Sequence, residues 1–166
     1  ALDPDENLIV TGFDNVADVY YTSTSKWSPT GTRIWQHAFT NSAPYRYTMQ
    51  PKKLAIGEIG QVFLLCSDEE NNAMAIAKYN PAGNYLFKVM YTGRTGNDIL
   101  FARTNDVNNL YITGMINGQK DSTELGDMYM MKADPANGNQ KASLKIYDTG
   151  RKDEGIALGF DLANDN

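Results

Sequence analysis

The sequence has only one cysteine, Cys66, and only one histidine, His37, among 166 residues. An intrachain disulfide is therefore excluded. Cys66 lies in an apolar run and is predicted to be a small buried hydrophobe, because free cysteine is usually buried. A cysteine nucleophile would need an activating histidine, and His37 is expected in a different strand. We expect His37 to be structural or exposed.

A basic surface and a long apolar run are also lacking. The 15 Lys and Arg residues are outnumbered by 20 Asp and Glu, which gives a formal net charge of −5. This charge argues against a nucleic acid or an anionic membrane surface as partner, since both need a basic face. No apolar run approaches the roughly 18–20 residues of a membrane span.

What the sequence does contain favours a folded protein made of strands. Hydrophobic residues make up 42% and charged residues 21%, and ten Tyr, six Phe and two Trp favour sheet over helix. The chain begins at Ala1 with no signal segment. Either a removed leader or a piece of a longer chain would explain this, and both fit a secreted protein.

One pattern occurs three times along the chain. Lys26, Lys78 and Lys132 each end an apolar segment and precede a turn that contains Pro and Gly, with spacings of 52 and 54 residues. Repeats of this length in a chain of strands are typical of propeller blades or related arrays. We predict one segment over residues 1–166, with repeats at approximately 8–60, 61–109 and 110–166.

Each repeat is predicted to contain four strands. The first strands are continuous apolar runs, as expected for strands covered on both faces, and they are predicted at Leu8–Gly12, Val62–Cys66 and Leu110–Gly114. The second strands are predicted at Val19–Trp27, Ala73–Tyr79 and Met128–Ala133. The third strands follow at Arg33–Thr40, Tyr85–Thr92 and Lys141–Asp148. The fourth strands, expected at the solvent-facing edge, are Tyr47–Ile56, Ile99–Thr104 and Gly155–Leu162.

The predicted fold class is all-β, with three four-stranded antiparallel blades of propeller type. Closed propellers have about four to eight blades, so three blades would form an incomplete propeller or one completed between chains. Open blade faces would be large apolar patches, and such patches imply a partner.

The motifs also resemble a family. Leu110-Tyr-Ile-Thr-Gly114, followed by Asp127-Met-Tyr-Met-Met-Lys132 and an Asp-Pro-x-x-Gly turn, is similar to the repeats of bacterial extracellular β-propeller proteins, which read roughly N-V-Y-V-T-G…D-Y…K-Y-D-P-x-G-N. The resemblance covers essentially the whole chain. It implies a secreted or cell-surface bacterial protein whose repeats bind or act as a scaffold and are not enzymatic. No catalytic residue and no cofactor follows from it.

Two sets of residues are candidates for binding. Arg46, Arg94 and Arg151 recur after the third strands, and a rim of arginines could bind carboxylates or sulfates. The alternative, which we favour, is that each pairs with nearby acids. Asp3, Asp5 and Asn7 alternate like calcium ligands but lack the Gly and the distal Glu of a calcium loop, which favours a capped turn. We predict no metal site, and we expect Trp27, Trp35, Tyr79 and Phe87 to pack between blades.

Three functions are therefore compatible with the sequence. The leading prediction is a non-catalytic propeller segment that mediates protein–protein or surface interaction. The second is a structural protein whose open blade faces associate into a ring or a filament. The third is a glycan hydrolase or lyase, which would need two acids about 5–10 Å apart, and the sequence shows no such pair that differs from turn aspartates.

Overall fold

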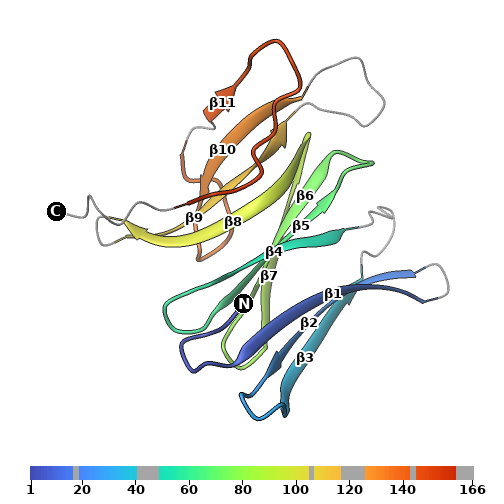
Figure 1. The fold of residues 1–166 in the computed structure, drawn as a ribbon, viewed down its shortest axis with the longest axis vertical. Coiled ribbons are helices and arrows are strands. Elements are labelled where there is room, and N and C mark those ends of the chain that lie inside the picture. Colours follow the sequence, from blue (N-terminus) through green and yellow to red (C-terminus); the bar gives the residue numbers. More distant parts are fainter. Residues whose placement is uncertain (17–18, 41–48, 105–106, 117–125, 143–144, 160–166) are drawn as a thin grey trace.

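The structure is a computed structural model that describes residues 1–16, 19–40, 49–104, 107–116, 126–142 and 145–159. Within these ranges the chain forms eleven strands and no helix, and the strands build three antiparallel sheets (Figure 1). The all-β prediction is thus confirmed. Among these residues there is no helix that could serve as a membrane span.

The three sheets follow one another along the chain. The first sheet has the order β1 (Leu8–Val16), β2 (Val19–Trp27), β3 (Arg33–Thr40). The central sheet has the order β4 (Gln50–Ile56), β5 (Val62–Asp68), β6 (Ala73–Tyr79), β7 (Tyr85–Thr92). The third sheet contains β8 (Arg94–Thr104), β9 (Val107–Ile116), β10 (Asp127–Ala133) and β11 (Lys145–Tyr147), with neighbours in that order.

The predicted grouping of the fourth strands is wrong. β4 was expected at the outer edge of the first sheet, but it pairs with β5 and so begins the central sheet. In the same way β8 pairs with β9 and begins the third sheet. Each of these strands leads into the next repeat, so every four-stranded sheet combines residues of two predicted repeats.

Most predicted strands are confirmed, and the largest differences are near the C-terminus. The second and third strands of the first two repeats have the predicted bounds. The strand predicted at Lys141–Asp148 is seen only as Lys145–Tyr147. Residues 155–159 of the strand predicted at Gly155–Leu162 are extended but not in a sheet, and residues 160–162 lie outside the described residues, as do residues 47–48.

The Pro-Gly turns are hairpins of the predicted kind. Gly31, Gly83 and Gly138 have φ values of +82°, +86° and +77°. Each glycine N–H donates to the carbonyl of the residue that opens its turn, Ser28, Asn80 or Asp134. Only glycine adopts this backbone conformation without strain, which explains why the repeat retains it.

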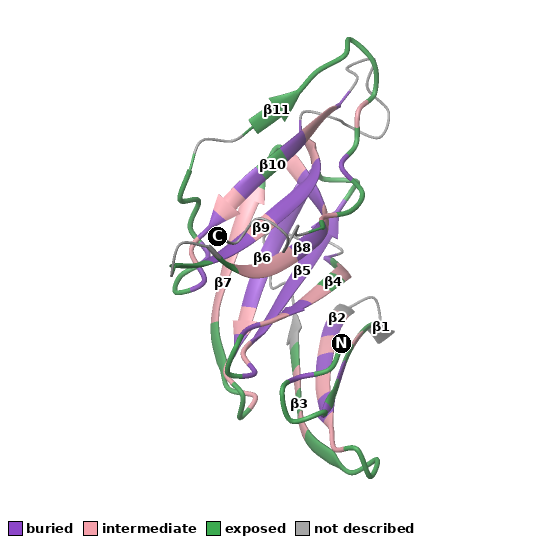
Figure 2. Ribbon diagram, turned by 60° about the vertical axis from the view of Figure 1, so that its left-hand side comes forward, coloured by how far each residue is buried: buried purple, intermediate pink, exposed green. Residues whose placement is uncertain are grey.

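The core consists of two layers, one on each side of the central sheet (Figure 2). Along β5, Phe63 and Leu65 pack toward the third sheet, whereas Val62, Leu64 and Cys66 belong to the layer shared with the first sheet. Every residue of β5 is buried. The central sheet is therefore the interior of the molecule.

Candidate binding surfaces

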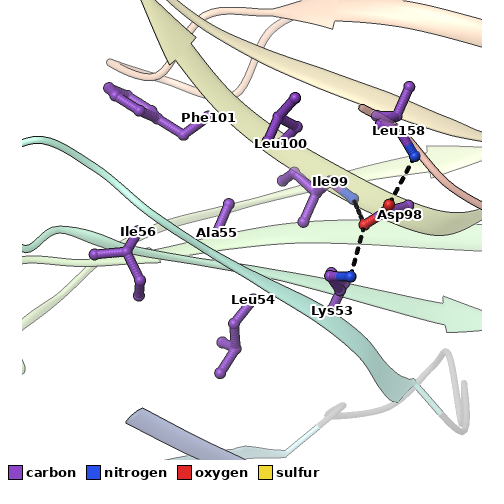
Figure 3. A pocket seen from close by; sticks show the side chains of 9 residues that line it. All are labelled: Lys53, Leu54, Ala55, Ile56, Asp98, Ile99, Leu100, Phe101 and Leu158. Atoms are coloured by element: carbon purple, nitrogen blue, oxygen red, sulfur yellow. Dashed lines mark hydrogen bonds and ion pairs between the residues drawn. The ribbon is translucent and has the colours of Figure 1, made fainter. Parts of the chain in front are cut away.

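A pocket lies between β4 and β8, the first or leading strands of the central and third sheets. Its volume is about 230 Å³, and it is lined by residues of β4 and β8 together with Leu158 (Figure 3). Most of the residues that line it have apolar side chains, and one ion pair joins the two charged ones, Lys53 Nζ to Asp98 Oδ1 at 3.4 Å. Ligand pockets usually measure about 300–1,000 Å³, so this one is small.

The carboxylate of this pocket is already occupied. Asp98 is 5% exposed. Its Oδ1 accepts the N–H of Ile99 at 2.9 Å, and its Oδ2 accepts the N–H of Leu158 at 2.8 Å. With Lys53 as a third partner, the group fixes Leu158 and β8 in place and has little capacity left for a substrate.

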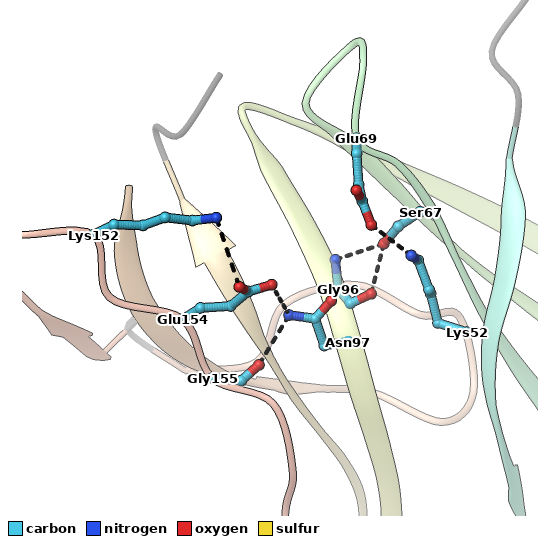
Figure 4. Close-up of polar contacts among 8 residues, drawn as sticks. All are labelled: Lys52, Ser67, Glu69, Gly96, Asn97, Lys152, Glu154 and Gly155. Atoms are coloured by element: carbon cyan, nitrogen blue, oxygen red, sulfur yellow. Dashed lines mark hydrogen bonds and ion pairs between the residues drawn. The ribbon is translucent and has the colours of Figure 1, made fainter. Parts of the chain in front are cut away.

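A close backbone contact joins the central and third sheets. Gly96 of β8 lies against Leu65 and Met74 of the central sheet. Its N–H donates to Ser67 Oγ at 2.7 Å, and Ser67 Oγ donates to the Gly96 carbonyl at 2.6 Å (Figure 4). Because a Cβ here would lie 2.8 Å from Leu65, the close approach needs glycine.

The segment Asp153–Leu158 repeats this contact on the outer face of the third sheet. Gly155 lies against Thr113 and Met128, which occupy the positions of Leu65 and Met74. Its N–H donates to the Gly114 carbonyl at 3.1 Å, and Asn97 Nδ2 donates to its carbonyl at 3.0 Å (Figure 4). The segment thus has the place of a leading strand, yet no sheet follows it in the described part of the chain.

In the first sheet, only two of the described residues stand beside the outer edge of β1, where the other sheets have a full leading strand. β1 ends this sheet, with β2 as its neighbour on one side. On the other side Ala1 exchanges two backbone hydrogen bonds with Ile9, at 2.8 and 3.0 Å, and Leu2 bridges to Leu8. Leu2 and Ala1 therefore take the positions of Ile56 and Ala55 beside β5. No described strand continues from Ala1 along the rest of β1.

The outer face of the first sheet exposes two apolar side chains of β1 beside polar ones, because the register places Ser25 and Gln36 next to Val10. Leu8 and Val10 are 46% and 43% exposed, whereas residues at the same positions in the other two sheets are fully buried: Val62 and Leu64 in β5, Leu110 and Ile112 in β9. β1 is thus not covered on both faces, in line with the open face that is predicted at each end of a three-blade array. The second strands show a difference in the sequence, because Ser25 of β2 stands where the central sheet has Ala77.

The arginines of the predicted rim differ in their surroundings where the structure describes them. Arg94 is half-buried, with its guanidinium over the rings of Tyr91 and Tyr129, 5.4 and 5.8 Å from their centroids. It donates weakly to Gln140 Oε1 at 3.4 Å. Arg151 is exposed, and Arg46 lies outside the described residues. Stacking on aromatic rings, rather than the expected pairing with acids, holds Arg94.

The N-terminal turn contains a lysine where a calcium ion would have to bind. Asp3 Oδ2 pairs with Lys26 Nζ at 2.6 Å, and Asp3 Oδ1 accepts the N–H groups of Asp5 and Asn7 at 3.0 and 2.8 Å. Burial raises the pKa of Asp3, but Lys26 and the Asn7 hydrogen bonds outweigh it, so its pKa lies below the ordinary value. The geometry favours the capped turn over calcium.

The single cysteine and the single histidine are both packing residues. Cys66 is buried, and burial raises the pKa of its thiol to about 12, as for an inert packing residue. His37 stacks on Tyr85 with centroids 5.5 Å apart and lies 5.2 Å from the Tyr79 ring. The predicted roles of both, packing and structural, are confirmed.

The third sheet carries one group of carboxylates, at the edge near β11. Partial burial, Asp148 and Asp153 together raise the pKa of Asp127. Asp148 accepts the Gly150 N–H at 2.6 Å, and Asp153 accepts both the N–H and the hydroxyl of Thr149 at 2.8 and 2.7 Å. Two of the three acids therefore serve as turn caps, which is the role expected for aspartates in this fold.

Comparison with known proteins finds no family model that matches the chain and no significant match among curated proteins.

Proposed function

We propose that this chain is a non-catalytic interaction module of propeller type, which associates with protein surfaces, that of a second copy included, through the outer face of its first sheet. The observation that carries the proposal is the exposure of Leu8 and Val10 at positions that are fully buried in the other two sheets. Exposed apolar side chains at positions that are otherwise buried are typical of surfaces that contact another protein.

The other features of the molecule agree with this role. The inner pocket is small and its carboxylate is occupied by structural partners. The central sheet also packs against the first sheet on one side and the third sheet on the other, and arrays of this type expose extended surfaces for recognition. By the resemblance of its repeats, we place the protein outside the cell or on the surface of a bacterium.

The test is association of the purified chain with and without a charge on the proposed face. Val10→Asp places a carboxylate on the face, and Ile59→Asp, in the turn before β5 at 70% exposure, is the matched control. In sedimentation velocity we expect concentration-dependent association of the wild type and of Ile59→Asp, and its loss in Val10→Asp. Monomers throughout, or equal association of all three proteins, would contradict the proposal.

A further inference from the structure

We propose that the first sheet separates from the central sheet as a unit, while the central and third sheets stay in contact. This inference goes beyond the proposed function, because it concerns the inner side of the first sheet and not its outer face. It follows from a difference between the two layers that the central sheet forms with its neighbours (Figure 2).

The layer between the central and third sheets is apolar from both sides. Phe63, Leu65 and Ile76 of the central sheet are fully buried in it. The third sheet meets them with large buried side chains, among them Ile99, Ile112, Tyr129 and Met131. Because the hydrophobic contribution grows with the apolar area that both sides bury, this contact is a strong one.

Hydrogen bonds fasten the same two sheets at separate places. Ser67 of β5 exchanges two hydrogen bonds with the backbone of Gly96 in β8. At the opposite edge of the central sheet, the hydroxyl of Tyr91 in β7 donates to the carbonyl of Gly138 at 2.6 Å. The central and third sheets are thus held along both edges of the central sheet.

The layer between the first and central sheets differs on the side of the first sheet. In the described part of that sheet, Ile9 is the one buried hydrophobic residue that belongs to the layer, and Trp35 is partly buried. The other buried side chains of the first sheet are polar: Thr22, Thr24 and Lys26. The central sheet meets this layer with the three alanines of β6 among its members. The first sheet therefore contributes much less buried apolar surface than the third sheet does.

Two buried polar atoms near this layer have no hydrogen-bond partner among the described residues. They are Nδ1 of His37 and the hydroxyl of Tyr79, whose rings lie 5.2 Å apart. Thr24 lies near that hydroxyl, but the two do not meet hydrogen-bond geometry. Burial without a partner opposes the contact, and separation of the sheets restores hydrogen bonds to water.

The third sheet has an atom of this kind as well, Nε of Arg94. Its guanidinium, however, also stacks on the rings of Tyr91 and Tyr129 and donates to Gln140. The imbalance between the two layers therefore remains, and the contact of the first sheet is the weaker one.

Separation uncovers a face of the central sheet that the closed molecule hides. Val62, Leu64 and Cys66 are fully buried and belong to the layer that the first sheet covers. Proteins open locally at their weakest contacts, at a lower free energy than global unfolding. The first sheet is thus a lid, and the open state presents an apolar face that the closed state does not.

The single cysteine makes the opening measurable. Cys66 lies on the covered face, near Thr22 of β2, so an aromatic disulfide reagent reaches its thiol only when the lid is displaced. The variant Cys66→Ala/Ala75→Cys moves the thiol to the paired position of the neighbouring strand, on the same face. The matched control is Cys66→Ala/Ala133→Cys, with the thiol in the layer between the central and third sheets. Both alanines are fully buried, so the two substitutions are alike.

In dilute protein under native conditions, we expect the thiols at positions 66 and 75 to react at least tenfold faster than the thiol at position 133. Their rates should also depend less on low concentrations of urea, because a local opening exposes less surface than global unfolding. One common rate at all three positions, or faster reaction at position 133, would overturn the proposal. In the unmodified chain, a Cys66 rate with the urea dependence of global unfolding would overturn it without any substitution.

Discussion

β1 and β5 have the same place in their repeats but opposite surroundings. Both are apolar, yet every residue of β5 is buried, whereas Leu8 and Val10 of β1 are nearly half exposed. The difference lies in what flanks each sheet and not in the strand itself. The central sheet has a neighbour on each side, and the first sheet has one neighbour among the described residues. Matched substitutions in the two strands can therefore separate intrinsic strand stability from burial.

The largest expected effect is on the central strand. Leu64→Ala removes a fully buried side chain and leaves a cavity, so we expect a loss of about 2–5 kcal/mol in the free energy of unfolding. Val10→Ala, at the equivalent position, should cost less than about 1 kcal/mol when the chain is dilute and dissociated. Urea unfolding of both variants measures the difference. Equal losses would show that the face of β1 is covered within the single chain.

The next comparison concerns two turns whose glycines have the same backbone conformation. Gly83 and Gly31 both have φ above +80°, but a Cβ at Gly83 would lie 2.5 Å from Trp35 Cγ, and a Cβ at Gly31 would meet nothing within 4 Å. Gly31→Ala should therefore cost about 1 kcal/mol from backbone strain alone. Gly83→Ala should cost about 1–3 kcal/mol more, because the indole must shift. Thermal unfolding of the two variants tests this, and identical melting temperatures would show that Trp35 does not pack on that turn.

The last comparison concerns the buried ion pair between Asp3 and Lys26. Asp3 is 6% exposed, and its pKa is lowered in the folded state. A carboxyl whose pKa is lowered by folding stabilises the protein fully above its unfolded pKa of 3.8, and this contribution is lost as the pH falls through the lower folded value. Asp3→Asn should therefore cost about 2 kcal/mol at pH 7.

The pH dependence distinguishes the ion pair from a general effect of the substitution. The difference between wild type and Asp3→Asn should shrink as the pH falls below 3.8, and it should be smaller at every pH in a Lys26→Met background. A difference that stays constant from pH 7 to pH 2.5 would show that the charge of Asp3 contributes nothing.

The sequence predicts the strands and turns of this fold well, because both depend on local chemistry. Alternating or continuous apolar runs define β2, β3, β6 and β7 to the residue, and the Pro-Gly turns define the hairpins between them. These features repeat three times, so each copy supports the interpretation of the others.

The pairing of β4 and β8 was mispredicted because strand partners are not a local property. One signal was present: Gly57-Glu-Ile-Gly60 is a short turn in which the Gly60 N–H donates to the Gly57 carbonyl, and it joins β4 directly to β5. The connection before β4 is longer. Weighing the two connection lengths would have placed β4 in the central sheet.

The binding surface was not predictable to the residue. Leu8 and Val10 are no more apolar than Val62 and Leu64, so the strand itself does not show the difference. The neighbouring strand does, because Ser25 pairs with Val10 where Ala77 pairs with Leu64. The arginine pattern, by contrast, was visible in the sequence. The structure shows that Arg94 packs on two rings.

The most direct test of the central claim is the mass of the unmodified chain by light scattering, across a range of concentrations. The account predicts a mass that rises with concentration above the 18.4 kDa of one chain, and no such rise in Val10→Asp. A mass that stays at that of one chain at all concentrations would contradict it.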